Sequence, residues 1–440
     1  MQRIQRIVKP ELHDIAQVLA RPAAPQRSVR ETVAAIITQV REAGDAALVA
    51  YAEQFEHAQI HQVVMPRARW EALAETVPEE LRVAIERSRR NIAAFHASQH
   101  SIEEPVDVEP GVTCWRKSVP LQRIGIYIPG GNAPLFSTVL MLAVPAQIAG
   151  CEDIVLASPP RPDGTIDPAI LYAALISGVH TVVTAGGAQA IAALAYGTES
   201  VPAVDKIFGP GNRFVTEAKQ QVAADRCAID MPAGPSEVMV VIDETAEPAF
   251  VAADLLSQAE HGPDSHSVLV VLHRDVHTAH QIVDAVESEL MKQAVSLSHS
   301  SSITSSLAHA KAVIVTDEET LLAVVNGYAP EHLLLNLANE SVIAEQVRNA
   351  GSVFLGQYSC ESMGDYASGT NHTLPTAGWA RSYSGVSLDS FVKKITFQRI
   401  TEVGLQSLGP IVHTLATAES LDAHAQAVTV RLQSLKKERP

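Results

Sequence analysis

The chain has 440 residues, 47% of them hydrophobic and 19% charged, so its composition supports two or more compact domains and excludes a wholly disordered protein. Its 49 acidic residues outnumber its 33 basic ones, and the net charge of -16 argues against a protein that binds nucleic acid through the phosphate backbone. The four cysteines are far apart in the sequence, which indicates neither a disulfide framework nor an all-cysteine zinc site and fits a reducing compartment.

We expect a cytoplasmic protein without a membrane partner. Charged side chains interrupt residues 1–19, so this stretch lacks the apolar core of a signal peptide. The longest apolar stretch, residues 139–149, contains Pro145 and Gln147 and is too short to span a bilayer.

Apolar residues at helical spacing dominate the first hundred positions. One stripe ends where Gly44 and Asp45 are expected to interrupt its helix, and a second follows Pro78 and two acidic residues that suit a first helical turn. The two stripes consist of Val33, Ile36, Ile37 and Val40, and of Leu81, Ile85, Ile92 and Phe95.

From Arg123 onward, short apolar strands alternate with helices of about ten residues, which is typical of βαβ units and a parallel sheet. Changes of texture near Arg123 and Ser236 predict the boundaries of two α/β units. The predicted strands are 124–128, 153–157, 181–184, 206–208, 238–242, 267–272, 312–315, 333–337 and 353–355. A helix is predicted after each of the first four strands, at 136–148, 168–176, 188–196 and 213–223.

The C-terminal part of the chain loses this alternation of strands and helices. Residues 364–378 are rich in Gly, Ser, Thr, Asn and Pro and predict a loop. Residues 408–432 predict a helical tail, which packs either on its own chain or on another.

Three predicted strands end in glycine-rich turns that open helices, at residues 129–132, 186–189 and 209–212. Glycine lets backbone approach a ligand, and a helix N-terminus at the carboxyl end of a parallel strand favours phosphate. The G-x-G-x-x-G fingerprint of dinucleotide-binding proteins does not occur in the sequence. Each of the three glycine-rich turns, taken singly, is explained as well by an ordinary strand-to-helix turn as by a ligand site. The three together favour a nucleotide or a similar anion.

Gln258 and His261 end a predicted helix over residues 248–261, and their spacing of three places both on one face. Such a pair can supply half of a tetrahedral metal site, although glutamine is an unusual zinc ligand. The alternative is a surface histidine favoured by the helix dipole. Glu331 and His332 place an acid beside a base where a strand begins, which suits either proton transfer or a solvated pair.

Asp365 and His372 flank a polar loop whose turn chemistry alone could explain them. His424 lies on the predicted tail, where by itself it would be a packed or surface histidine. Taken together, Gln258, His261, Asp365 and His424 would make a nitrogen and oxygen set for one divalent ion, most simply zinc. Sequence spacing cannot show that they meet.

These motifs closely resemble those of the histidinol dehydrogenase family. They include Phe208-Gly-Pro-Gly-Asn212 and Asp254-Leu-Leu-Ser-Gln-Ala-Glu-His-Gly-Pro-Asp264, and they follow the family order along most of the chain. The other matching segments are 125–131, 133–138, 186–194, 230–237, 330–333, 364–372 and 423–424.

The resemblance implies a zinc-dependent oxidation of L-histidinol to L-histidine with two NAD, through an enzyme-bound aldehyde, at the end of histidine biosynthesis. It implies an α/β fold of two incomplete Rossmann-like parallel-sheet domains, similar to those of aldehyde dehydrogenases, with a helical N-terminal segment and a C-terminal dimerisation tail. The implied domains are a helical segment at 1–24, a discontinuous domain at 25–123 and 237–378 with the metal and catalytic residues, an NAD-binding domain at 124–236, and a tail at 379–440 exchanged within a homodimer.

The resemblance also implies the roles of individual residues. One zinc per subunit would be held by Gln258, His261, Asp365 and, from the partner chain, His424; it would orient the substrate's amine and imidazole. His332, as a neutral base, would take the hydroxyl proton, and Glu331 would activate the water that attacks the aldehyde. The remaining substrate contacts implied are Ser236, His372 and Glu419, and the NAD contacts are Tyr127, Gln189 and Asn212.

Some segments depart from the family pattern. Residues 357–363 form a variable lead into the metal loop, 379–387 differ in detail, and Glu419 lacks some of its usual neighbours. Other classes remain open: a zinc hydrolase would not need Tyr127, Gln189 and Asn212, and a non-catalytic relative would lack some of the site residues. A dehydrogenase for another polar alcohol is the nearest alternative, against which His372 and Glu419 argue because they suit an imidazole and an amine.

Overall fold

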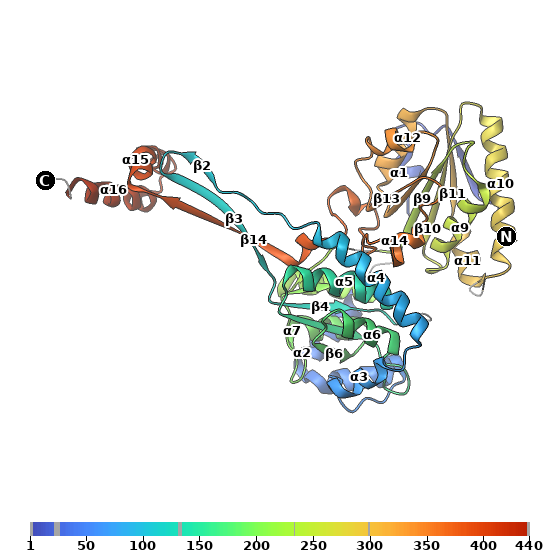
Figure 1. Cartoon of the computed structure of the whole chain (residues 1–440), viewed down its shortest axis with the longest axis horizontal. Coiled ribbons are helices and arrows are strands. Elements are labelled where there is room, and N and C mark those ends of the chain that lie inside the picture. Colours follow the sequence, from blue (N-terminus) through green and yellow to red (C-terminus); the bar gives the residue numbers. More distant parts are fainter. Residues whose placement is uncertain (1–2, 22–26, 131–133, 233, 298–299, 438–440) are drawn as a thin grey trace. The chain divides into compact units, whose positions relative to one another are not determined.

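The computed structural model describes residues 3–21, 27–130, 134–232, 234–297 and 300–437. It divides into two compact units, Met1–Gln99 with Leu121–Phe391, and His100–Pro120 with Val392–Pro440 (Figure 1). None of the helices in the described ranges is both long and apolar enough to cross a membrane.

A six-stranded parallel sheet forms one core of the first unit. Its order is β1 (Gln5–Val8), β11 (Lys311–Val315), β10 (His266–Leu272), β9 (Glu237–Ile242), β12 (His332–Asn336) and β13 (Ser352–Leu355). Every residue of β9 is buried, because helices cover both faces and a parallel strand between them must be apolar throughout.

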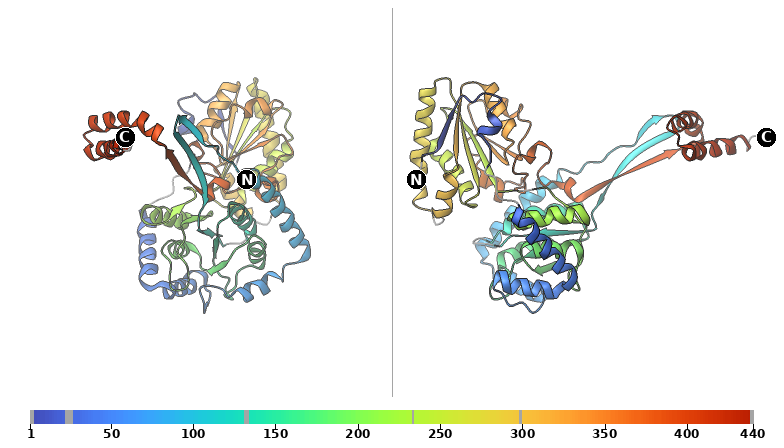
Figure 2. Two further views of the ribbon diagram at one scale, coloured as in Figure 1. Left: turned by 60° about the vertical axis from the view of Figure 1, so that its left-hand side comes forward. Right: turned by 180° about the vertical axis from the view of Figure 1, so that it is seen from behind.

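Alternate residues of β9 enter two separate helix layers, which Figure 2 shows on either side of the sheet. Val238 and Val240 pack with α9 (Pro248–Ala259), α10 (Val276–Ala294) and α11 (Ser300–Leu307). Met239 and Val241 pack with α1 (Ile15–Val18), α12 (Glu318–Tyr328) and α13 (Glu340–Ala344).

A second parallel sheet in the same unit has five strands. Its order is β6 (Thr181–Thr184), β5 (Asp153–Ser158), β4 (Arg123–Tyr127), β7 (Lys206–Phe208) and β8 (Ala228–Ile229). The helices that follow its strands are α5 (Phe136–Ala149), α6 (Pro168–Ile176), α7 (Gly187–Tyr196) and α8 (Arg213–Asp225).

The N-terminal helices pack on this second sheet's helices. α2 (Arg27–Glu56) contacts α7 and α8, α3 (Arg67–Ala74) contacts α6, and α4 (Glu79–Ala97) contacts α5. Residues 27–97, which we expected to belong with residues 237–378, thus contact the helices of the five-stranded sheet, and α4 also hydrogen-bonds through Ser88 and Asn91 to the carbonyls of Tyr366 and Ala367.

The second unit is a three-stranded antiparallel sheet followed by a helix pair. The sheet order is β14 (Val392–Ile400), β3 (Val112–Pro120) and β2 (Val106–Glu109), and α15 (Glu402–Ala418) packs against α16 (Asp422–Lys437). Gly409 lets α16 pack closely on α15, because a Cβ there would lie 2.8 Å from Leu432 Cδ1 and would force that side chain to shift.

Most of the predicted strands and helices from Arg123 onward are confirmed within one or two residues at each end. The predicted interruption of α2 is also confirmed, since Gly44 has φ 52°. Two shorter elements sit in the first unit's C-terminal part: 3-10 turns at Trp379–Arg381 and Leu388–Phe391.

Five strands of the described ranges were not predicted: β1, β2, β3, β8 and β14. The described part of the segment 1–24 thus contains a strand as well as a helix, and the predicted tail at 379–440 contains the nine-residue strand β14. All five strands are largely or partly exposed, so they lack the continuous buried apolar run that identifies an interior parallel strand. The predicted apolar stripe of α4 was also wrong at one of its positions. Phe95, which we placed in the stripe, is exposed, and the neighbouring His96 is buried instead.

Candidate active site

A cluster of ionisable side chains lies at the amino ends of β9 and β12. Glu331 precedes β12, His332 is its first residue, and Glu237 is the first residue of β9. The Glu237 backbone N–H donates to Glu331 Oε2 at 2.7 Å, and His332 Nδ1 lies 3.3 Å from the Glu237 carbonyl oxygen. The neighbouring strand thus holds the predicted acid and base side by side. Ligands of open parallel sheets usually bind at the opposite, carboxyl ends.

A short helix, α14 (Glu361–Tyr366), adds two further carboxylates to this cluster. Glu361 and Asp365 are four residues apart and lie on one face of α14. Glu361 Oε1 is 3.6 Å from His332 Nδ1, and Asp365 Oδ1 is 3.4 Å from His332 Nε2. The Glu331 Oε2 atom is 3.8 Å from His332 Nδ1, so three carboxylates surround one imidazole.

Burial and mutual charge shift the pKa values within this cluster. Burial opposes a charged imidazolium, but the carboxylates of Glu361, Glu331 and Asp365 outweigh it and raise the pKa of His332 to about 10. Burial raises the pKa of both Glu331 and Glu361 to about 8, although His332 acts against it. Burial by itself would raise the pKa of Asp365, but the contact with His332 outweighs it and lowers the pKa of that carboxyl.

Several buried polar atoms of the cluster lack hydrogen-bond partners. These are both amide atoms of Gln258, both carboxylate oxygens of Glu361, Asp365 Oδ1 and His332 Nε2. Donor atoms of His261, Glu361 and Asp365 all lie within 4.8 Å of one another. Leaving such groups unpaired is costly, and a mixed nitrogen and oxygen set suits a divalent ion such as zinc. The residues present therefore fit a metal site.

The helix that carries Gln258 ends earlier than predicted. α9 stops at Ala259, and His261 lies in the turn that follows, where its backbone N–H donates to the Gln258 carbonyl at 3.3 Å. The structure still brings His261 to the carboxylates of α14, but through this turn and not through a shared helix face. The predicted loop over 364–378 likewise begins inside α14.

His372 lies between α14 and α5. Its Nδ1–H donates to the Asp365 carbonyl at 2.8 Å, and its Nε2 accepts from the Thr138 hydroxyl at 3.2 Å. The neighbouring Asn371 donates to the Met141 carbonyl at 2.6 Å, which ties the same loop to α5. His372 is therefore held beside the α14 carboxylates by two elements.

Three predicted site residues stand apart from these contacts. Ser236 is half-buried immediately before β9, and its carbonyl accepts from the His266 backbone N–H at 3.0 Å. Glu419 caps the C-terminus of α15, and His424 lies in the first turns of α16. Both belong to the second unit and are exposed there.

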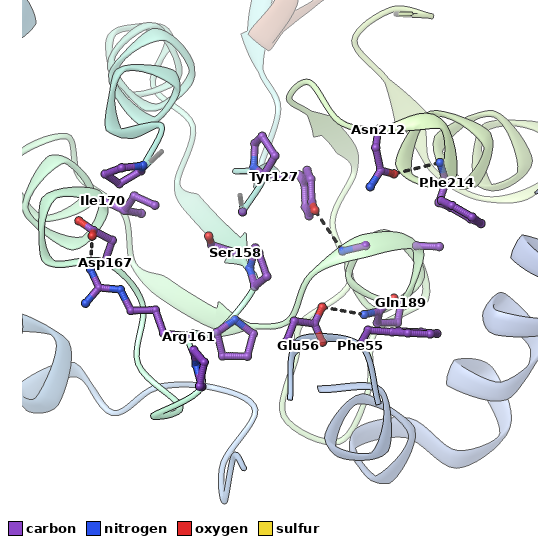
Figure 3. Close-up of a pocket in the computed structure, with 18 of the residues that line it drawn as sticks. Phe55, Glu56, Tyr127, Ser158, Arg161, Asp167, Ile170, Gln189, Asn212 and Phe214 are labelled. Atoms are coloured by element: carbon purple, nitrogen blue, oxygen red, sulfur yellow. Dashed lines mark hydrogen bonds and ion pairs between the residues drawn. The ribbon is translucent and has the colours of Figure 1, made fainter. Parts of the chain in front are cut away.

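Tyr127, Gln189 and Asn212 line one pocket of about 810 Å³ in the first unit. Figure 3 shows them at the carboxyl ends of β4 and β7 and at the start of α7. The pocket is of the size and mixed lining that small-molecule and cofactor sites have. The structure thus brings these three predicted residues together. Of the predicted turn 129–132, Pro129 and Gly130 line the pocket, and residues 131 and 132 lie outside the described ranges.

Backbone and side chains hold the pocket's polar groups in place. The Gly187 N–H donates to the Tyr127 hydroxyl at 3.0 Å, and burial raises the pKa of that phenol to about 12. Asn212 caps α8 by accepting from the Phe214 N–H at 3.0 Å. Gly209 has φ 123°, and a Cβ there would lie 2.2 Å from the Tyr127 carbonyl oxygen, so only glycine fits.

Sequence reasoning missed one carboxylate in each of these sites, the buried Glu361 and the half-buried Glu56. Glu361 lies in the segment 357–363 that was set aside as variable, and its spacing of four from Asp365 was the available signal. Glu56, at the end of α2, accepts from Gln189 Nε2 at 3.3 Å in the pocket (Figure 3). No local signal marks Glu56, because its partner lies in a different part of the chain.

Known proteins resemble this chain over nearly all of its length. A family model for histidinol dehydrogenase matches residues 19–432. The histidinol dehydrogenase of Bacteroides fragilis is 50% identical over 428 residues, which cover 97% of this chain and 99% of that protein. The chloroplastic histidinol dehydrogenase of Arabidopsis thaliana is 49% identical over 420 residues, 94% of this chain and 88% of that protein. The crystal structure of histidinol dehydrogenase from Elizabethkingia anophelis has a TM-score of 0.94 at 46% identity, covering 98% of this chain and 99% of that one.

Proposed function

Because the chain belongs to the histidinol dehydrogenase family and is an NAD-dependent oxidoreductase, we propose that it oxidises L-histidinol to L-histidine in two steps, through L-histidinaldehyde that stays bound. The observation that carries the proposal is the buried cluster in which an acid and a base, Glu331 and His332, adjoin unpaired nitrogen and oxygen donors.

One zinc per subunit would be held by Gln258, His261 and Asp365, with His424 supplied by the tail of a second chain. The unpaired donor atoms of Gln258 and Asp365 support this assignment. When bound, the cation supplies positive charge that orients the substrate's amine and imidazole nitrogens and lowers the pKa of His332 towards the neutral form.

His332 and Glu331 divide the proton transfers between them. Neutral His332 takes the proton of the substrate hydroxyl in the alcohol step. Glu331 takes a proton from the water that attacks the aldehyde, and its bond from the Glu237 N–H keeps the carboxylate aimed beside His332. His372, fixed through Asp365 and Thr138, together with Ser236 and Glu419, would contact the polar groups of the substrate.

NAD would bind in the pocket lined by Tyr127, Gln189 and Asn212, within a Rossmann-like unit at residues 124–236. The N-termini of α7 and α8 meet the pocket at Gly187 and Asn212, where backbone N–H groups favour a pyrophosphate. When bound, the nicotinamide supplies the hydride acceptor for each oxidation.

A homodimer that exchanges the tail at residues 379–440 would complete each site with Glu419 and His424. The second unit leaves a set of large apolar side chains exposed, which is typical of a surface that meets a partner. They include Val106 and Val108 of β2, Ile395, Phe397 and Ile400 of β14, and Val403, Ile411 and Leu415 of α15. All four cysteines are free, which suits the reducing cytoplasm that we propose as its compartment.

The test is reduction of NAD by L-histidinol, followed spectrophotometrically, with L-histidine identified as the product. We expect turnover with L-histidinol and little with a panel of other polar alcohols, and none after verified removal of the metal. Preference for another alcohol, or full turnover by metal-free protein, would contradict the proposal.

A further inference from the structure

Glu361 is a fully buried carboxylate without a hydrogen-bond partner. Its side chain is 1% exposed, and neither carboxylate oxygen accepts a hydrogen bond. Burying a carboxylate is expensive unless it is paired, hydrogen-bonded or bound to a metal. The nearest cation, the His332 imidazole, is 3.6 Å away, outside hydrogen-bond distance.

Two neighbouring side chains, His261 and Asp365, supply further metal donors beside Glu361. Donor atoms of Glu361, His261 and Asp365 lie within 4.8 Å of one another, close enough to share one ion. Asp365 follows Glu361 by one turn of α14, so the backbone aims both carboxylates the same way.

Gln258 gives an independent sign that a ligand belongs at this place. Its side chain is completely buried, and both of its amide atoms lack a partner. α14 packs against α9, which carries Gln258, and the Glu361 backbone hydrogen-bonds to Asp254 one turn earlier on α9. A buried side-chain amide whose nitrogen and oxygen both lack hydrogen-bond partners is rare in native proteins.

We propose that Glu361 is a metal ligand, so that the first unit of a single chain offers Gln258, His261, Glu361 and Asp365 to one divalent cation. Four nitrogen and oxygen donors are as many as a structural zinc site uses, so this set would hold the cation without the tail. In the dimer, His424 and the substrate then enter a metal site that already exists, displacing or joining Glu361. This inference rests on the proposed metal dependence but concerns a residue outside the ligand set that the family resemblance implies.

The experiment compares metal affinity in Glu361→Gln, Glu260→Gln and the unchanged protein. Glu260 is the matched control, because it carries the same charge next to His261 but is exposed and lies outside the three-residue donor group. Each full-length protein is loaded with zinc, equilibrated with graded chelator and analysed for metal per chain. Cobalt-loaded forms are compared by their visible absorption, which reports the ligands directly.

We expect Glu361→Gln to lose metal at chelator concentrations about 10- to 100-fold lower than the other two proteins, with a changed cobalt spectrum. Glu260→Gln should match the unchanged protein. His424→Ala should retain its metal better than His261→Ala, since the tail is not needed for the first four donors. Glu361→Asp, which keeps the charge, should recover part of the affinity.

Thermal unfolding of the metal-free forms checks that the substitution has not simply disrupted the fold. Without a cation, Glu361→Gln should unfold at or above the temperature of the unchanged protein, because it removes a buried carboxylate that no hydrogen bond satisfies. An unchanged metal affinity and cobalt spectrum in Glu361→Gln would overturn the inference, even if its activity fell. If the unchanged protein reduces NAD with histidinol, the proposed function stands whatever Glu361→Gln does.

Discussion

Replacing Glu331 with glutamine should separate the two oxidations. Glu331 Oε2 accepts a 2.7 Å hydrogen bond from the Glu237 N–H, and a glutamine amide oxygen can accept the same bond. The Glu331 residue is 5% exposed and the replacement has nearly the same volume, so the start of β12 should keep its position. The amide cannot take a proton from water, which is the one property that the variant loses.

The expected loss is confined to the aldehyde step. A positioned general base contributes about 10²- to 10⁴-fold to a rate, so Glu331→Gln should slow aldehyde oxidation by that factor. Alcohol oxidation, which we assign to His332, should proceed at a rate close to that of the unchanged protein. Burial raises the pKa of Glu331 to about 8, so the aldehyde step of the unchanged protein should quicken as pH rises towards that value. The variant should lack this dependence.

The assay measures NADH formed from L-histidinol and, separately, from L-histidinaldehyde. The unchanged protein should form two NADH for each histidinol consumed, whereas Glu331→Gln should form one and accumulate bound aldehyde. His332→Asn provides the opposite comparison, with the alcohol step impaired. Equal losses of both steps in Glu331→Gln would refute this division of roles.

Three further predictions address assembly, the cofactor pocket and pH. His424→Ala chains and His261→Ala chains should each be inactive alone, but mixed dimers of the two should regain activity. One site of each heterodimer then has a complete ligand set, so at most one site per heterodimer works. Verified mixed dimers that stay inactive would show that the tail is not shared. Gly209→Ala should raise KM for NAD and lower stability by about 1–3 kcal/mol, because φ is 123° and the new Cβ would lie 2.2 Å from the Tyr127 carbonyl oxygen; normal NAD kinetics would argue that this turn is not at the cofactor. Burial raises the pKa of Glu56 from 4.5 to about 7, so its contribution to stability is full below about 4.5 and is lost as pH rises through about 7; Glu56→Gln should reduce the fall in Tm over this range, and an unaltered pH profile would contradict the cause.

The sequence alone determined the elements whose residues carry a local pattern. The apolar run at 238–242 predicted a buried strand, and β9 is buried at every residue because helices cover both faces of its sheet. Glycine-rich turns marked the carboxyl ends of β6 and β7, and Gln189 and Asn212 in those turns do line one pocket. The position of Glu331 and His332 at the start of a strand was also correct. In each case neighbours along the chain carry the signal.

Only the tertiary structure decided which of these elements meet. Surfaces supplied by distant segments decide three features of the fold. They determine that His96 and not Phe95 is buried in α4, that β3 pairs with β14, and that α2 packs on α7 and α8. The cluster around His332 also depends on distant segments, because Glu361 on α14 lies beside His261. Glu361 belongs to the segment that we described as a variable lead into the metal loop. A metal donor set is defined by distances in space of a few ångström between residues about a hundred positions apart. Local hydrophobic periodicity contains no information about such distances, and the packing of α14 on α9 creates them.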